Sequence, residues 1–479
     1  FQAEDGIRDC LLSRGLGDVY KRQHLILSGK SQPDLLYVDR IFLHERTGSF
    51  ALKSLKERGL KVKNPKHVFA TMDHIVDTFP GRGDETLMPG GKKFIQTMRE
   101  LANEFGITLF DINDPRHGIS HLISAEQGIA LPGNIVTCPD SHTCTLGALG
   151  AIGWGVGSSD CEHALATSSL AGNKPRQMQI IFSGELNEGV NAKDMMLHLM
   201  EKYSVSGGAG YAIEFSGDTI DNLPLENRFT LCNMAVEFSA FTGIIAPDQK
   251  VFDYLKDRPY SPNKAWAETI DYWKSLHSDE NAIFDKVIEI DASQIYPSVS
   301  WGLSPEQSIP IDGSIPNLHE ISNPDKKEEL ESSLKYMGLK SGQSLMHLPI
   351  DAAFIGSCTN ARLDDLRSAA KILKGNKVSG DVLAICTPAS ETVKRNAEKE
   401  GIDQIFKDAG FEWREPGCSL CFYAGGEGFL PEQRVITSTN RNFRGRQGPG
   451  VRSHLASPAT VAASAIAGKI ISSKEVMKK

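Results

Sequence analysis

The stretch AAFIGSCTN, residues Ala352–Asn360, joins a short apolar run to a polar turn that carries Cys358. Four consecutive apolar residues that end at a glycine are typical of a buried strand. The next amphipathic stretch, Leu366–Leu373, is typical of a helix. Cys358 is therefore expected at a strand-to-helix turn, where outward-pointing backbone N–H groups stabilise a thiolate.

The same alternation of strands and helices recurs along the chain. Met178–Phe182 predicts another buried strand, and Ala192–Tyr203 and Glu391–Glu400 predict helices. Such alternation indicates an α/β fold, with parallel or mixed sheets covered by helices. Residues 245–325 are rich in Pro, Asp, Ser and Trp, which predicts an insertion with a loop-rich linker.

Length and charge exclude several classes of protein. A chain of 479 residues is too long for one ordinary domain, so two or three are expected. The net charge of −8 and the absence of a Lys/Arg block disfavour a nucleic-acid binder, including an RNA-binding regulator. No apolar run approaches the roughly 18 residues of a membrane span, and no secretory leader is present. We therefore expect a cytoplasmic protein, or a protein of an organelle matrix if a transit peptide has been lost.

Residues 1–23 differ in character from the rest of the chain. They show no coherent apolar period and resemble translated sequencing-adapter read-through, so we exclude them, with Cys10, from the fold prediction. We expect Leu11, Leu12 and Val19 to pack against no core, and the native N-terminus to have been lost.

The cysteines pose a question of chemistry. The chain has nine, an odd number in a long chain, which disfavours a disulfide framework. Cys418 and Cys421 form a CxxC in the tight turn PGCSLC, and no thioredoxin-like context suggests a redox pair. With Cys358, they offer three thiolates and leave one position open. A [4Fe–4S] cluster, a zinc ion with a bound water, as in a zinc-dependent hydrolase, and structural thiols all remain possible.

Histidines and carboxylates form a second candidate set. A neutral histidine is a good general acid or base, and a nearby carboxylate orients it. Each of these histidines lies in a short, polar, turn-like segment rather than on the apolar face of a helix. The candidate catalytic residues are Asp73 and His74 in TMDH, His121 in GISH, Asp140 and His142 in PDSH, and Glu237 in CNMAVE.

Two further segments stand out. The loop NRNFRGR contains Asn440, Arg441 and Arg446. Arginine forks bind carboxylates in a bidentate manner, so this loop predicts a small polyanionic substrate. The stretch GALGAIGWGVG, residues 147–157, lacks the spacing of a nucleotide loop. It predicts close backbone packing near a buried site.

Seven segments together resemble the aconitase superfamily: FATMDH, GISH, CPDSHT, LCNMAVE, FIGSCTN, PGCSLC and TSTNRNFRGRQGPG. They occur in the family's order and cover residues 24–470. The resemblance implies three α/β domains around a [4Fe–4S] cluster, at residues 24–172, 173–310 and 311–479, with the cluster cysteines in the last. It also implies that the fourth, swivelling domain of single-chain aconitases is missing here.

The resemblance implies a role for each candidate residue. Cys358, Cys418 and Cys421 match the three cluster ligands that leave one iron open. Asn233 matches an asparagine beside the cluster, and Asn440, Arg441 and Arg446 match residues that contact cluster and substrate. The implied carboxylate–histidine pairs are Asp73–His74, Asp140–His121 and Glu237–His142.

Within the superfamily, LLYVDRIFLHE, YWKSLHSDE, SWGLSPEQ and FEWREPGCS resemble the isopropylmalate dehydratase subfamily. That resemblance implies dehydration and rehydration of 2-isopropylmalate, and a small partner subunit that carries the swivelling domain and a serine base. FYAGGEGF at residues 422–429 and TPAS at 387–390 depart from the subfamily's usual segments. A related hydro-lyase acting on citraconate/citramalate or homoaconitate is the alternative.

Overall fold

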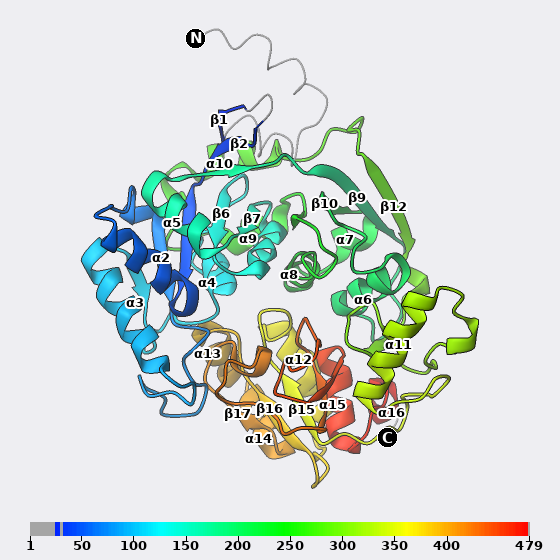
Figure 1. Cartoon of the computed structure of the whole chain (residues 1–479). Helices are drawn as coiled ribbons and strands as arrows, with labels where there is room; N and C mark the ends of the chain where they lie inside the picture. The colour runs from blue at the N-terminus through cyan, green and yellow to red at the C-terminus, as the bar shows by residue number, and fades with distance from the viewer. Residues whose placement is uncertain (1–23, 29–31, 478–479) are drawn as a thin grey trace. The chain divides into compact units, whose positions relative to one another are not determined.

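The structure is a computed structural model that describes residues 24–28 and 32–477 (Figure 1). The expectations for residues 1–23 fall outside the described part of the chain. Within that part, every helix is too short or too polar to cross a membrane. The described residues form two compact units. The first contains residues up to 74, 92–184 and 208–291, and the second contains 75–91, 185–207 and 292–477.

The first sheet of the first unit has five strands, all parallel. Its order is β5 (Thr108–Phe110), β4 (Val68–Thr71), β3 (Arg40–His44), β6 (Ile135–Cys138) and β7 (Ile152–Gly155). Helices α2 (Glu45–Glu57), α3 (Gly91–Phe105), α4 (Ser120–Glu126) and α5 (Ser158–Thr167) accompany these strands. Parallel strands are covered on both faces, which explains why β4 and β6 are buried along their whole length.

A second parallel sheet in this unit has the order β11 (Thr242–Ile244), β10 (Tyr211–Ser216), β9 (Arg176–Ser183) and β12 (Lys286–Asp291). Helices α7 (Asp218–Asn222), α8 (Leu225–Asn233), α9 (Gln249–Leu255) and α10 (Trp266–Lys274) belong to the same part of the chain. Strands β1 (Leu25–Leu27), β2 (Asp34–Tyr37) and β8 (Ser169–Gly172) form a small antiparallel sheet. The interpretation of residues 245–325 as an insertion with a linker is therefore wrong in part, because β12 extends this sheet beside β9.

The second unit is built on a third parallel sheet, with the order β17 (Glu412–Trp413), β16 (Leu383–Cys386), β15 (Ala352–Ile355), β18 (Arg434–Thr437) and β19 (Arg452–Leu455). Its helices are α6 (Ala192–Tyr203), α11 (Pro324–Met337), α12 (Leu363–Leu373), α13 (Glu391–Lys399), α14 (Ile402–Ala409), α15 (Pro458–Ala467) and α16 (Ser473–Met477). A hairpin joins β13 (Ser298–Ser300) to β14 (Ser308–Pro310).

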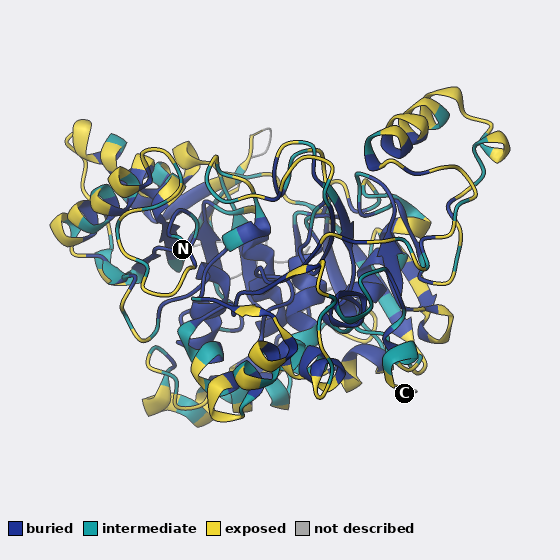
Figure 2. Ribbon diagram, turned by 90° about the horizontal axis from the view of Figure 1, so that it is seen from below, coloured by how far each residue is buried: buried dark blue, intermediate teal, exposed yellow. Residues whose placement is uncertain are grey.

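A continuous apolar core holds the second unit together. Ile355 and Ile436 of the sheet pack with Leu366 of α12, Phe406 of α14 and Val461 of α15. Figure 2 shows the buried strands in dark blue and the exposed turns of the outer helices in yellow.

The predicted strand at Ala352–Ile355 and the predicted helix at Ala192–Tyr203 are confirmed at both ends. Each of the three predicted domains contains one parallel sheet, and their boundaries stay a prediction.

Candidate active site

His74 lies between two carboxylates in the first unit. The residue follows β4, and its Nδ1 is 2.6 Å from Oδ1 of Asp73, while its Nε2 is 2.9 Å from Oδ2 of Asp140. Burial alone would raise the pKa of Asp73, but the charge and hydrogen bond of His74 outweigh it and lower the pKa to about 2. An ionised carboxylate can accept but cannot donate a hydrogen bond. Both ring nitrogens of His74 therefore carry a proton, and the ring is an imidazolium.

Asp140 is the centre of this histidine cluster. It precedes the 3-10 helix η3 (Ser141–Leu149), and its Oδ1 accepts a hydrogen bond from the backbone N–H of His142 at 2.7 Å. Nε2 of His121 lies 3.0 Å from the same oxygen, at ion-pair distance but without the alignment of a hydrogen bond. Burial works against ionisation, but His121, His142 and His74 lower the pKa of Asp140 well below its usual value. The carboxylate of Asp140 is thus in contact with three histidines.

The third predicted pair is also in contact. Nε2 of His142 lies 2.8 Å from Oε1 of Glu237, which follows α8, and both side chains are buried. Asn233 ends α8 and donates a hydrogen bond to the Thr145 hydroxyl at 2.8 Å. The structure therefore brings together all three predicted carboxylate–histidine pairs within one unit.

The glycine-rich stretch holds this cluster by close backbone approach, as predicted. A Cβ on Gly155 would lie 2.6 Å from the carbonyl oxygen of Asp140, and a Cβ on Gly153 would lie 2.0 Å from that of Thr143. A Cβ on Gly147 would lie 1.7 Å from the carbonyl oxygen of Gly243. Larger side chains at these positions would displace the loop that carries Asp140 and His142.

Two residues of the histidine cluster, His44 and Glu45, were not predicted from the sequence. The Glu45 carboxylate accepts the backbone N–H groups of Asp73 and His74, at 3.1 Å and 2.8 Å. The ring of His44 stacks on the ring of His74, with 3.9 Å between their centroids. The available signal was a His–Glu pair directly after the apolar run of β3, at the strand end where α2 begins.

The three predicted cluster cysteines lie in loops of the second unit. Cys358 follows β15, Cys418 directly precedes the short 3-10 turn η7 (Ser419–Cys421), and Cys421 is the last residue of that turn. All three are buried and form no disulfide. Ser357 and Ser419, next to Cys358 and Cys418, have φ angles of 77° and 47°, in the left-handed region. Such conformations are unfavourable for residues other than glycine and concentrate at functional sites.

Polar groups around the sulfurs fit an iron–sulfur cluster. Nδ2 of Asn440 lies 3.6 Å from Sγ of Cys358, and the guanidinium of Arg446 lies 3.4 Å from Sγ of Cys421. Hydrogen bonds to cysteine sulfur tune an iron–sulfur cluster, and a neighbouring cation favours the thiolate over the thiol. Asn440, predicted to contact cluster and substrate, thus lies beside a cysteine sulfur, and its contact with substrate stays a prediction.

Two buried cations that were not predicted from the sequence hold these loops. The guanidinium of Arg362 donates to the carbonyl oxygens of Cys358 and Thr359, each at 2.7 Å. The ammonium of Lys193, on α6, donates to the carbonyl oxygens of Ser438 at 3.0 Å and Thr439 at 2.6 Å. These bonds fix the backbone before Asn440. Nothing in their local sequence distinguishes them from surface cations.

The arginine loop, residues 440–446, is hydrogen-bonded to FYAGGEGF, the segment whose sequence departs from that of the subfamily. Arg441 and Arg446 are both partly exposed, and Nε of Arg446 is a buried donor without a hydrogen-bond partner among the described residues. The backbone N–H of Tyr423, in FYAGGEGF, donates to the carbonyl oxygen of Arg446 at 2.7 Å. Glu427 of the same segment pairs with the buried Arg414 at 2.6 Å. The segment with the unusual sequence thus contacts Arg446, which is predicted to bind the substrate.

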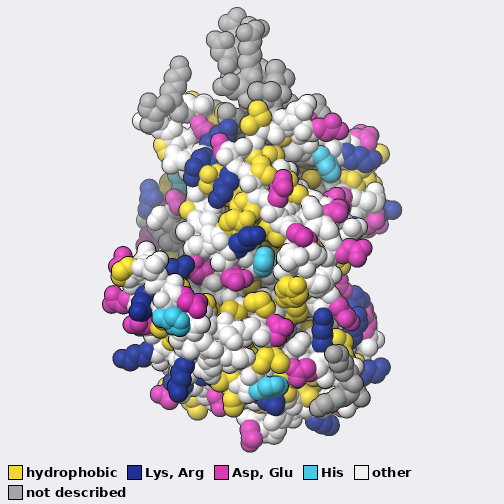
Figure 3. Space-filling model, turned by 90° about the vertical axis from the view of Figure 1, so that its right-hand side faces the viewer, with side chains coloured by type: hydrophobic (Ala, Val, Ile, Leu, Met, Phe, Trp, Pro, Cys, Tyr) yellow, Lys and Arg dark blue, Asp and Glu magenta, His cyan; other side chains and the backbone are white. Residues whose placement is uncertain are grey.

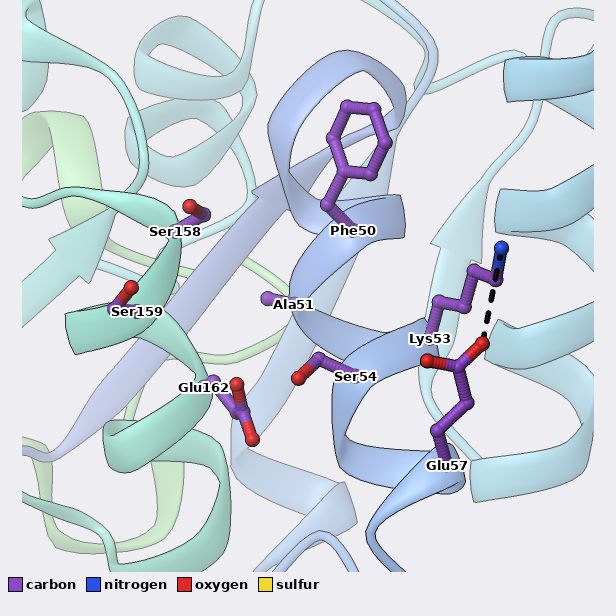
Figure 4. A pocket seen from close by; sticks show the side chains of 8 residues that line it. All are labelled: Phe50, Ala51, Lys53, Ser54, Glu57, Ser158, Ser159 and Glu162. Atoms are coloured by element: carbon purple, nitrogen blue, oxygen red, sulfur yellow. Dashed lines mark ion pairs between the residues drawn. The ribbon is translucent and has the colours of Figure 1, made fainter.

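A separate surface pocket of about 320 Å³ lies between α2 and α5 (Figure 4). It is lined by Phe50, Ala51, Lys53, Ser54, Glu57, Ser158, Ser159 and Glu162. Ser158 and Ser159 belong to GSSDCEH, and none of the predicted site residues lines the pocket. On the face drawn in Figure 3, basic and acidic side chains are interspersed.

Comparisons with known proteins show what the chain is similar to. The model of the Aconitase family (aconitate hydratase) matches residues 18–468. The chain is 47% identical over 449 residues, 94% of each chain, to the 3-isopropylmalate dehydratase large subunit 1 of Bradyrhizobium diazoefficiens. It is 46% identical to the large subunit 2 of Salmonella typhimurium, over 93% of this chain and 94% of that one. A solved structure, Thermococcus kodakaraensis aconitase X in its holo-form, matches 90% of each chain at 13% identity and a TM-score of 0.47.

Proposed function

The chain belongs to the aconitase family, and on that premise we propose that it is the large subunit of a hydro-lyase that interconverts 2-isopropylmalate and 3-isopropylmalate. The reaction removes water to form an alkene and adds it back at the neighbouring carbon, a step of leucine synthesis. Two relatives that match almost the whole chain carry the name of this enzyme, which supports the substrate. The eight cysteines of the described residues are buried and form no disulfide, which favours a reducing compartment, the cytoplasm.

The observation that carries the chemistry is the position of His74 between Asp73 and Asp140. Hydroxide is a poor leaving group, so dehydration needs a proton delivered to the departing oxygen. His74 already holds a proton on each ring nitrogen, and two carboxylates stabilise the resulting cation. His74 is the general acid of the proposal. His121 and His142 lie beside Asp140 in the same cluster.

Cys358, Cys418 and Cys421 would hold the [4Fe–4S] cluster of the family, leaving one iron without a cysteine. When bound, the cluster supplies a Lewis acid for the hydroxyl and carboxylate of the substrate. Asn440 and Arg446 would donate hydrogen bonds to the cysteine sulfurs, and Arg362 and Lys193 would keep the ligand loops in place.

Arg441 and Arg446 are the proposed binding groups for the two substrate carboxylates. A guanidinium matches a carboxylate in a bidentate manner, and the Nε of Arg446 remains available for such a bond. Both arginines lie on the loop that follows β18.

The base that removes the carbon-bound proton is proposed to lie on a small partner subunit. The histidine cluster is protonated at its centre and suits delivery of protons rather than their removal from carbon. We propose that a serine on the swivelling domain of the partner takes this role, as the family resemblance implies.

Anaerobic reconstitution with iron and sulfide tests the proposal. The cluster-loaded chain, mixed with a cognate small subunit, should convert 2-isopropylmalate to 3-isopropylmalate, and either component alone should not. Citraconate and homoaconitate serve as competing substrates. If one of these turns over faster than 2-isopropylmalate, the substrate assignment is wrong while the hydro-lyase chemistry stands. Iron without acid-labile sulfide, or zinc in its place, would contradict the cluster.

A further inference from the structure

We propose that His44 and Glu45 are positioning residues for His74: together they fix the ring of the proton donor and the backbone on which it stands. The proposal depends on the proposed function for the catalytic role of His74, and on the geometry alone for the contacts. All residues concerned belong to the first unit.

Glu45 fixes the backbone. Its two carboxylate oxygens accept the N–H groups of Asp73 and His74, at 3.1 Å and 2.8 Å, and the side chain is completely buried. Buried backbone N–H groups require an acceptor, and after the end of β4 these two have left the sheet. A single carboxylate therefore holds both the general acid and the first carboxylate that orients it. Oδ2 of Asp73 in turn accepts the N–H of Ser120 at 2.9 Å.

His44 fixes the ring. Its Nε2 lies 3.0 Å from the carbonyl oxygen of Pro139, and a carbonyl can only accept, so Nε2 carries the proton. Burial, followed by the charge of His74, lowers the pKa of His44 to about 4, so the ring is neutral at physiological pH. A neutral aromatic ring attracts a cation across its face. The two rings stack at 3.9 Å with an interplanar angle of 23°, so a neutral imidazole supports an imidazolium.

The same hydrogen bond joins His44 to the second carboxylate. Pro139 directly precedes Asp140, which accepts from Nε2 of His74 at 2.9 Å. The junction of β3 and α2, which carries His44 and Glu45, thus lies between the loop of Asp73 and the loop of Asp140. Both hydrogen-bond partners of His74 are set by contacts with this one dipeptide.

A bound cation is the competing explanation. His44, Glu45, Asp73 and His74 each offer a ligand atom, and these atoms lie within 4.8 Å of one another. However, the carboxylate oxygens of Glu45 and Asp73 already accept N–H groups, and Nε2 of His44 is committed to Pro139. Hydrogen bonding therefore accounts for the arrangement, and metal analysis decides between the two.

Three variants test the proposal in the full chain, loaded with cluster and paired with its small subunit. His44→Ala removes the stacked ring, and His44→Phe keeps an uncharged ring that can stack but cannot exchange a proton. Glu45→Gln keeps the shape of the side chain but places an NH₂ group against one of the two N–H donors. His163→Ala, an exposed histidine on α5 of the same unit, is the matched control.

We expect His44→Ala and Glu45→Gln to lower kcat by about 100-fold, the usual cost of a misplaced reacting group, with KM changed less than about threefold. His44→Phe keeps a stacked ring but loses the hydrogen bond to Pro139, so it should lower kcat less than His44→Ala does, and the control should be unchanged. If Phe is as damaging as Ala while thermal midpoints stay the same, the stacked ring does not position His74 and the proposal fails. It also fails if the activity loss follows the loss of folded protein, or if Glu45→Gln releases a stoichiometric non-iron metal.

A readout without turnover separates this proposal from the proposed function. In chain labelled with ¹⁵N-histidine, the His74 ring should show two protonated nitrogens in the wild type and in His44→Phe. In His44→Ala, these ring protons should exchange with water faster and their signals should broaden or vanish. Unchanged His74 signals in His44→Ala would refute the positioning role, whatever the enzyme's substrate proves to be.

Discussion

Oδ2 of Asp140 accepts a hydrogen bond from Nε2 of His74 at 2.9 Å, across 66 residues of sequence. The other oxygen of Asp140 lies 3.0 Å from Nε2 of His121 and accepts the backbone N–H of His142, so a single, largely buried carboxylate contacts three histidines. Removing its charge should therefore affect proton transfer far more than folding.

Asp140→Asn should lower kcat by about 10² to 10⁴-fold, the range that general acid catalysis contributes. The amide is nearly isosteric, but its NH₂ group cannot accept from a histidine, so His74 loses one of the two anions that keep it protonated. KM should change little, because Asp140 holds the histidines rather than the substrate. Steady-state kinetics of the reconstituted complex measures both constants. Asp111→Asn, which breaks the partly exposed Arg99–Asp111 pair, should leave kcat unchanged.

The chain should lose stability as the pH falls below about 6.5. His44 has its pKa lowered from 6.5 to about 4 by burial and by the charge of His74. The unfolded state therefore binds a proton first, and stability that is complete above pH 6.5 is lost as the pH falls toward 4. At about 1.4 kcal/mol per pKa unit, His44 accounts for about 3 kcal/mol of this loss.

Urea unfolding of the chain between pH 7 and pH 4.5 measures the effect. His44→Phe, which cannot be protonated, should show a flatter dependence on pH than the wild type. His454 stays as an internal reference in both proteins, because burial and the charge of Arg434 lower its pKa to about 3. If the free energy of unfolding depends on pH in the same way in both proteins, His44 is not buried as a neutral ring.

Replacing a cluster cysteine should abolish iron retention. Cys358→Ser, Cys418→Ser and Cys421→Ser should each lose the visible absorbance, the acid-labile sulfide and the activity, because each removes one of three ligands. Cys386→Ala, in β16, should keep all three properties and lose only about 1–3 kcal/mol of stability. A Cys418→Ser protein with full iron content and normal turnover would overturn the assignment.

Arg446→Lys should raise KM by about 10- to 100-fold, because an ammonium cannot replace the bidentate bond of a guanidinium to a carboxylate. Cluster absorbance should shift slightly, since Arg446 also donates to the sulfur of Cys421. Arg444→Lys is the matched control: Arg444 is exposed, lies over the ring of Tyr336 and should leave KM unchanged. Equal effects of the two substitutions would point to the net charge of the loop rather than to a binding role.

Segments with strong local signals could be predicted from the sequence. The α/β class, the strand at Ala352–Ile355 and the helix at Ala192–Tyr203 follow from apolar periodicity. The contacts of Asp140 with His121 and of His142 with Glu237 followed from family resemblance, since no spacing in the sequence predicts them.

Residues that meet their partners only because distant parts of the chain pack together could not be predicted in this way. Glu45 meets Asp73 and His74 because β3 and β4 are neighbours in a sheet, and no local pattern shows which strands pair. Lys193 likewise contacts carbonyl groups 245 and 246 residues away. The strand β12 was missed because its exposed, polar alternate residues resemble a linker.

The most direct test of the proposed function is the turnover of 2-isopropylmalate by the cluster-loaded chain, measured alone and with its small subunit. We predict formation of 3-isopropylmalate at kcat values of roughly 1–10³ s⁻¹ in the complex, and no measurable turnover by the chain alone despite full cluster content. Turnover by the isolated chain at the rate of the complex would contradict the two-subunit mechanism. A cluster-loaded complex that leaves 2-isopropylmalate unchanged would contradict the proposed function itself.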